Sequence, residues 1–240
     1  MADHTKTAEP APTSFAIPPL IKRNTILFAL SHSFSGAGMQ FAYGLGPLMV
    51  LKLTGSSSLA GLSVAIIGLS RFIIAYPIGR ITDIFGRKPG ILMGLAIALV
   101  GTIVVGLGMI GSDAVMFSVG LLIFAMGMNA AQQLRVAATD MFPPAYRAQA
   151  LGFIALGSLT GLVISPLMIA TGDYLGKAWN TEGLALPWLM LPGLIIPGMI
   201  LVLYVRPDPK HIGMNLEAYY PGYEPPAHRA ENLEAFSPMT

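Results

Sequence analysis

The chain has 240 residues, of which 54% are hydrophobic and only 11% are charged, and its formal net charge is +2. Soluble domains carry about 25% charged residues, so the composition excludes a water-soluble globular fold for most of the chain. Cysteine is absent, which excludes disulfides and thiolate metal sites.

Six apolar segments follow one another along the chain, each near the length of about 20 residues that a bilayer core requires. They cover residues 24–51, 59–79, 89–111, 114–135, 147–171 and 184–205. Residues 1–21 before them are polar, and residues 206–240 after them are polar and rich in proline. We therefore predict an all-α integral membrane protein, with a six-helix transmembrane bundle over residues 22–205 between an N-terminal tail and a linker-like C-terminal tail.

The basic residues predict the orientation of this bundle. Those on one side of the predicted spans are Lys22, Arg23, Arg80, Arg87, Lys88, Arg135, Arg147, Arg206 and Lys210, whereas the other side has only Lys52 and Lys177. Because cytoplasmic loops carry the excess of Lys and Arg, we predict a multi-pass protein of the inner (cell) membrane with both tails cytoplasmic. Trp179 and Trp188 are then expected at the outer membrane interface.

The connection between the second and third spans reads Gly79-Arg-Ile-Thr-Asp83-Ile-Phe-Gly86-Arg87-Lys88. Glycine permits close backbone approach and tight turning, so Gly79 and Gly86 predict a short loop over residues 80–88. Asp83 can cap a helix or form an ion pair. Arg87 and Lys88 are expected to hold the loop on the cytoplasmic side.

Three segments resemble the major facilitator superfamily of membrane transporters. The pattern G-x-x-x-D-x-x-G-R-K of residues 79–88 resembles the loop between helices 2 and 3 of that family. Residues 140–152, which begin at Asp140 and include Arg147, resemble its loop between helices 4 and 5. Residues 206–213 resemble the start of its central linker. The resemblance covers residues 22–213, which correspond to one N-terminal six-helix half.

The resemblance implies two inverted three-helix repeats that work by alternating access with a second six-helix half. That half would come from a separate chain, a paralogue or a second copy of this chain, unless this chain is a fragment of a longer transporter. The motif Asp83-x-x-Gly86 is echoed by Asp173-x-x-Gly176 after the fifth span, as inverted repeats would place it. The resemblance also implies a conformational latch that holds the halves together, made of Gly79, Asp83, Gly86, Arg87 and Lys88.

Polar side chains inside membrane spans are costly and are therefore candidates for function. The predicted substrate-binding residues are His32, Met39, Gln40, Tyr43, Arg71, Asn129 and Gln133. Arg71 can bind an anionic group by bidentate contact, or it can bond to neighbouring helices or extend toward the cytoplasm. His32 can bind substrate or a proton, or it can be a packing residue. No Asp or Glu lies in any predicted span.

Together these features predict the N-terminal half of a secondary active transporter for a small solute, with an anionic solute favoured by Arg71. Two alternatives remain open: a non-transporting accessory or assembly subunit, and a copper importer that uses His32, Met39, Met126 and Met128. The spans contain no catalytic motif, so an enzyme is not expected. The expected partners are a small-molecule substrate, the lipid bilayer and the second half; no nucleic acid, cofactor or resident metal is expected.

Overall fold

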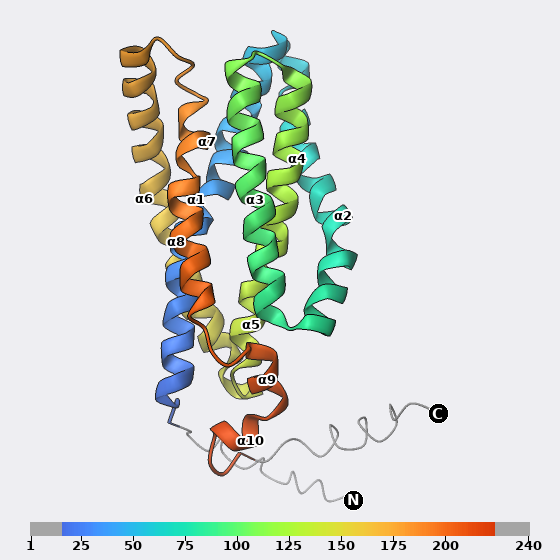
Figure 1. Ribbon diagram of the computed structural model, residues 1–240, viewed down its shortest axis with the longest axis vertical. Coiled ribbons are helices and arrows are strands. Elements are labelled where there is room, and N and C mark those ends of the chain that lie inside the picture. The colour runs from blue at the N-terminus through green and yellow to red at the C-terminus, as the bar shows by residue number, and fades with distance from the viewer. Residues whose placement is uncertain (1–15, 224–240) are drawn as a thin grey trace, which may run out of the picture.

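The computed structural model describes residues 16–223 and is a bundle of long helices that run side by side (Figure 1). The long helices are α1 (Pro19–Thr54), α2 (Leu62–Phe85), α3 (Arg87–Ile110), α4 (Ala114–Ala131) and α6 (Arg147–Trp179). The shorter ones are α5 (Gln133–Asp140), α7 (Leu186–Met190), α8 (Pro192–Leu203), α9 (Pro209–Met214) and α10 (Leu216–Tyr219), with 3-10 turns η1 (Ser57–Leu59) and η2 (Pro144–Tyr146). Much of both predicted tails lies outside the described residues.

Within residues 16–223, five segments are long and apolar enough to cross a membrane. They are Ser57–Phe85, Arg87–Ile110, Ala114–Asp140, Pro144–Trp179 and Leu186–Leu203. Helix α1 has 36 residues and covers the first predicted span, but it is not among these five. Its interior carries polar side chains such as His32 and Gln40, which lower its hydropathy. Five spans are therefore supported by length and composition, and the sixth stays a prediction.

The helices pack in two groups that meet along the middle of the bundle. Helix α4 packs against both α3 and α2, while α1 packs against both α6 and α8. Figure 1 shows α6 and α8 on one side and α2, α3 and α4 on the other, while α1 starts beside α6 and α8 and crosses toward the far ends of α3 and α4. The end at which α1 begins is also the end at which α9 and α10 lie.

A seam of glycines lets α3 and α4 approach closely. A Cβ atom at Gly94 of α3 would lie 2.6 Å from the backbone nitrogen of Ala131, and one at Gly120 of α4 would lie 2.6 Å from that of Val105. These distances are too short for any side chain, so the two backbones are nearly in contact. Small residues at helix interfaces allow this kind of packing in membranes, and the α3–α4 pair is accordingly the most intimate in the bundle.

The fourth predicted span is longer than its hydropathy indicated. The chain turns at Gln132 and then continues as α5 to Asp140, because the buried residues Leu134, Ala137 and Ala138 preserve an amphipathic pattern. Arg135 was expected in the connection between spans but lies within α5. Arg135 is exposed there.

The predicted loop over residues 80–88 is wrong in its extent. Helix α2 continues to Phe85, and Gly86 alone, with φ 102°, separates it from α3. The close approach predicted at Gly79 is also absent from the described part of the chain, since a Cβ atom there would meet nothing within 4 Å. Gly90 has the tight contact instead, against the buried side chain of Thr82.

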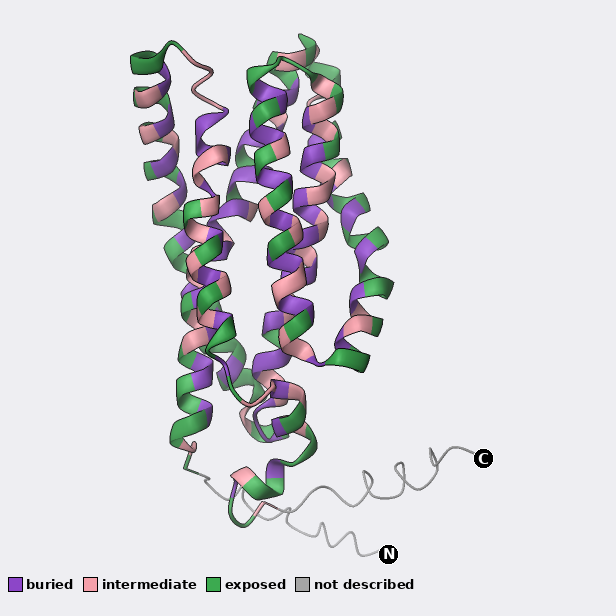
Figure 2. Ribbon diagram, in the orientation of Figure 1, coloured by how far each residue is buried: buried purple, intermediate pink, exposed green. Residues whose placement is uncertain are grey.

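Trp188 does not face outward, as a residue of an aromatic belt at the membrane interface would. Its side chain is fully buried and packs edge-to-face on Phe124, with ring centroids 5.0 Å apart. Its indole nitrogen donates to the sulfur of Met49 at 3.2 Å. Trp179, in contrast, is 63% exposed. Figure 2 shows that the exposed positions follow the outward faces of α2 and α6, whereas α3 and α4 are buried along their shared seam.

Candidate functional site

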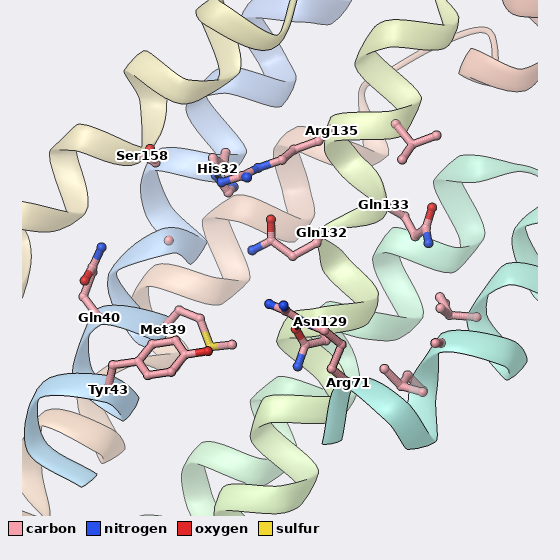
Figure 3. A pocket seen from close by; sticks show the side chains of 15 residues that line it. His32, Met39, Gln40, Tyr43, Arg71, Asn129, Gln132, Gln133, Arg135 and Ser158 are labelled. Carbon is pink, nitrogen blue, oxygen red and sulfur yellow. Dashed lines mark hydrogen bonds between the residues drawn. The ribbon is translucent and has the colours of Figure 1, made fainter. Parts of the chain in front are cut away.

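A cavity of about 630 Å³ opens between the two groups of helices. It is lined from α1, α2, α4, α5 and α6 (Figure 3). Its lining residues are His32, Gly36, Met39, Gln40, Tyr43, Arg71, Ile74, Ala75, Ile78, Asn129, Gln132, Gln133, Arg135, Val136 and Ser158. All seven predicted substrate-binding residues are among them, so the structure brings them together. Their role in binding a substrate stays a prediction.

Arg71 extends from α2 into this cavity. Its Nε donates to the side-chain oxygen of Asn129 at 3.3 Å, and the Asn129 amide donates to Ser70 Oγ at 2.9 Å. Ser70 is fully buried and its hydroxyl donates to the carbonyl of Ile67 at 2.7 Å. The guanidinium is therefore oriented by a neutral amide rather than neutralised by a carboxylate. Its positive charge remains available to the cavity.

Arg135 reaches the same cavity from α5 and points toward His32 (Figure 3). Its Nη2 lies 3.4 Å from Nε2 of His32. A guanidinium has no acceptor atom, so it is the donor, and the imidazole accepts through an unprotonated Nε2. Arg135 was not predicted as a site residue, because the predicted fourth span ends at this position.

The cavity is positively charged. None of the lining residues, all of which belong to the described part of the chain, is Asp or Glu. Arg71 and Arg135 contribute full charges, while Gln40, Gln132 and Ser158 contribute neutral hydrogen-bonding groups. A concave site with one sign of charge attracts ligands of the opposite sign. The site can therefore hold a small anion and donate several hydrogen bonds to it.

A second polar cluster lies at the end of the bundle where α2 meets α3. Arg87 Nε binds Asp140 Oδ2 at 2.8 Å, its Nη1 lies 3.5 Å from Asp83 Oδ1, and Nη1 donates to Thr82 Oγ1 at 3.1 Å. Arg87 thus joins α2, α3 and α5. The Asp83 side chain is 73% exposed, so most of its carboxylate faces outward.

Asp208 completes this cluster and was not predicted. Its carboxylate accepts from the backbone N–H groups of Arg87 at 3.1 Å, Lys88 at 3.0 Å and Lys210 at 2.8 Å. It therefore caps the starts of α3 and α9 together. The Lys88 ammonium donates to the carbonyls of Leu203 at 2.6 Å and Val205 at 3.1 Å, which fixes the end of α8.

Two glycines of the predicted latch, and Arg147 of the predicted loop between the fourth and fifth spans, differ in whether they contact this cluster. A Cβ atom at Gly86 would lie 2.7 Å from Asp208 Oδ2, so glycine is required there by the cap as well as by the positive φ. The Lys210 ammonium donates to the carbonyl of Asp83. Arg147 is exposed at the start of α6, and Gly79 lies in α2 without a close neighbour. The structure therefore brings Asp140 into the cluster but not Arg147 or Gly79.

The residues considered for copper do not form one site. His32 and Met39 line the cavity, but Met128 is buried in the main apolar core and Met126 packs against the apolar cluster of Ile74 and Ile78. Across residues 16–223 there is also no group of three or more His, Cys, Asp or Glu side chains that could hold a metal ion.

Comparison with known proteins places the chain among transporters. The family model described as Major Facilitator Superfamily matches residues 28–218. The chain is 32% identical over 192 residues to the uncharacterized MFS-type transporter YddS of Bacillus subtilis, with 79% of this chain and 44% of YddS covered. It is 24% identical over 158 residues to the riboflavin transporter RfnT of Brucella anthropi, with 65% of this chain and 40% of RfnT covered.

A crystal structure of a D-xylose-proton symporter shares the fold. The TM-score is 0.56 at 14% sequence identity, over 90% of this chain and 51% of the symporter chain. The chain therefore spans about half the length of the proteins that it matches.

Proposed function

Because the chain belongs to the major facilitator superfamily, we propose that it forms one half of a secondary active transporter whose cavity binds a small anionic solute. The family points to a multi-pass, non-enzymatic membrane transporter. An anionic substrate is supported by one observation: Arg71 and Arg135 both line the cavity, and none of its described lining residues is Asp or Glu. Both guanidinium groups face this open cavity, and a concave site lined by positive charge attracts ligands of the opposite sign.

The half-transporter arrangement is supported by the outward faces of α2 and α6. Phe72 and Tyr76 of α2 are 87% and 74% exposed, and Val163 and Leu167 of α6 are 73% and 66% exposed. A second six-helix half packs against these faces and closes the cavity, and the two halves rock about it in alternating access. In this arrangement the exposed carboxylate of Asp83 faces the second half.

Six spans and an inverted repeat are supported by the packing pattern. In an inverted repeat the first three spans correspond in order to the last three. Helix α1 then corresponds to the α4–α5 span, α2 to α6, and α3 to the α7–α8 span. The contact of α1 with α6 then corresponds to that of α4 with α2, and the contact of α1 with α8 corresponds to that of α4 with α3. With six spans both tails are on one side, and the positions of the basic residues make it the cytoplasmic side of the inner membrane.

A non-transporting accessory subunit is the competing function. Such a subunit needs only apolar surfaces that pack against its partner, and it has no use for charged side chains in an open cavity. Arg71 and Arg135 line such a cavity, and this favours the transporter.

The proposed function is tested by a ligand screen on the 240-residue chain in lipid nanodiscs. A ligand that binds only the folded state raises the melting temperature. We expect stabilisation by one or more of pyruvate, succinate, inorganic phosphate and methanesulfonate, confirmed by calorimetric titration. Stabilisation by D-xylose or riboflavin alone, with no effect of any anion, would contradict the anionic substrate.

A further inference from the structure

We propose that a groove between α1 and α6 binds one anionic phospholipid of the surrounding bilayer. The groove has a volume of about 900 Å³ and is lined by residues within 17–33 and 142–160. It shares no residue with the cavity that Arg71 and Arg135 line. The lipid site is therefore separate from the proposed anion site, and either proposal can fail without the other.

The length of the groove matches one leaflet of a bilayer. At one end the two helices touch, because a Cβ atom at Gly157 would lie 2.4 Å from the carbonyl oxygen of Ala29. From there the groove extends to the starts of both helices, where Lys22 lines it. Between Lys22 and Ser33 helix α1 rises by about 16 Å at 1.5 Å per residue. This is close to half of the roughly 30 Å hydrocarbon core of a bilayer, so one acyl chain fits along the groove.

The walls of the groove are apolar and exposed. On α1, Ile26 and Leu30 are 50% and 45% exposed, and on α6, Phe153 and Leu156 are 42% and 61% exposed. On the inner side the groove is backed by Phe142, which is buried. Large apolar side chains on the outside of two membrane helices contact lipid tails rather than water.

The groove faces away from the cavity. Ser158 is the α6 residue that lines the cavity, whereas Leu156 and Thr160 line the groove. Two residues turn a helix by about 200°, so these two side chains point away from Ser158. Val163 and Leu167, which we propose to contact the second half, lie farther along α6 and do not line the groove. The groove therefore stays open to lipid when the second half is in place.

The mouth of the groove is basic. Lys22 is exposed there, and it takes part in none of the ion pairs within residues 16–223. Arg147 is exposed at the start of α6. Neither α1 nor α6 has an acidic residue in its first turn, although the partial positive charge of a helix N-terminus favours an anion. A phosphate headgroup at this end pairs with Lys22 and offsets both helix ends.

These features together select an anionic phospholipid over other occupants. A zwitterionic lipid fills the apolar walls but brings no net negative charge to Lys22. A soluble phosphate reaches Lys22 but leaves the walls uncovered. One lysine near a membrane surface favours an anionic lipid by about fivefold, so this is the preference expected at the groove.

Native mass spectrometry of the 240-residue chain in detergent tests the proposal, because it counts the lipids bound to each molecule during a titration. The probes are palmitoyl-oleoyl phosphatidylglycerol, its phosphatidylcholine counterpart and glycerol phosphate, which has the anionic group without acyl chains. We expect one phosphatidylglycerol molecule to bind about fivefold more tightly than phosphatidylcholine. Glycerol phosphate should not displace it.

Two pairs of variants assign the lipid to the groove. Lys22→Gln should reduce the affinity for phosphatidylglycerol to nearly that for phosphatidylcholine, whereas Arg80→Gln changes an exposed arginine outside the groove and should retain the preference. Leu156→Trp narrows the groove and should weaken both lipids by about tenfold, the loss expected when roughly two methylene groups lose their contact. Its control is Leu162→Trp, at a residue of α6 that is similarly exposed but lies outside the groove.

Four results would overturn the proposal. The first is equal affinity of the wild type for the two lipids, and the second is a preference that survives Lys22→Gln or is lost equally in Arg80→Gln. The third is displacement of the lipid by glycerol phosphate, which would show a site for soluble phosphate. The fourth is a dimer in the mass spectrum that Leu156→Trp dissociates without changing lipid binding, because the groove would then be an interface between two copies of the chain.

Discussion

Replacing Arg71 with leucine is expected to weaken binding of the anion by about 10-fold to about 100-fold, because a hydrogen bond to a charged group contributes about 1.5–3 kcal/mol. The fold is expected to be unchanged, since the guanidinium is bonded to the neutral amide of Asn129 rather than to a buried carboxylate. Replacing Arg71 with lysine keeps the charge but loses the planar fork, so its affinity should lie between those of the wild type and the leucine variant.

Arg80→Leu is the matched control for this measurement. Arg80 lies on the same helix, is exposed and does not line the cavity, so its loss should leave the calorimetric affinity unchanged. Equal affinity in Arg71→Leu and the wild type would show that Arg71 does not bind the anion. A large drop in melting temperature in Arg71→Leu would show that the arginine has a structural role instead.

Replacing Asp208 with alanine is expected to destabilise the protein by about 2 kcal/mol or more, because loss of one helix cap typically costs about 1 kcal/mol and this carboxylate caps two helices. The backbone N–H groups of Arg87, Lys88 and Lys210 would all lose their acceptor. Chemical or thermal unfolding in detergent measures the change. The starts of α3 and α9 should also exchange their amide hydrogens faster.

Asp83→Asn is the control for the cap. Asp83 is mostly exposed and only 3.5 Å from Arg87 at its nearest, and surface ion pairs contribute about 0–1 kcal/mol. If Asp83→Asn has a small effect and Asp208→Ala a large one, the stability comes from the cap, and Asp83 is available for the proposed contact with a second half. Equal effects would contradict this division of roles.

The cavity was largely predictable because polar residues stand out in an apolar span. His32, Arg71 and Asn129 each interrupt a run that would otherwise be hydrophobic, and the interior of the bundle is the place where such side chains can find partners. Arg135 could not be found in this way. Hydropathy ends the fourth span at that residue, whereas amphipathic packing of Leu134 and Ala137 carries the helix onward.

The second polar cluster, around Arg87 and Asp208, was harder to predict because its contacts join distant parts of the chain. Arg87 and Asp140 are 53 residues apart, and Arg87 and Asp208 are 121 apart, so local sequence does not reveal that they meet. The spacing of glycine and charged residues in 79–88 indicated a functional segment, but we predicted it as a loop. The helix continues instead because Thr82 packs against Gly90 and keeps the last turns of α2 on α3.

The central claim is that the cavity is electropositive and admits anions, and cysteine modification tests it most directly. The chain has no cysteine, so Ser158→Cys places one thiol in the cavity and Ser57→Cys places one on the exposed turn η1 as a reference. Each variant is reacted with an anionic sulfonatoethyl methanethiosulfonate and with its cationic trimethylammonium analogue. The quantity of interest is the ratio of the anionic rate to the cationic rate.

We predict that this ratio is at least about tenfold higher at residue 158 than at residue 57, because a charged cleft concentrates counter-ions. The preference should fall when Arg71 or Arg135 is replaced by glutamine in the Ser158→Cys background, and pyruvate should slow the anionic reagent. Equal ratios at the two positions, or faster reaction of the cationic reagent at residue 158, would contradict the account.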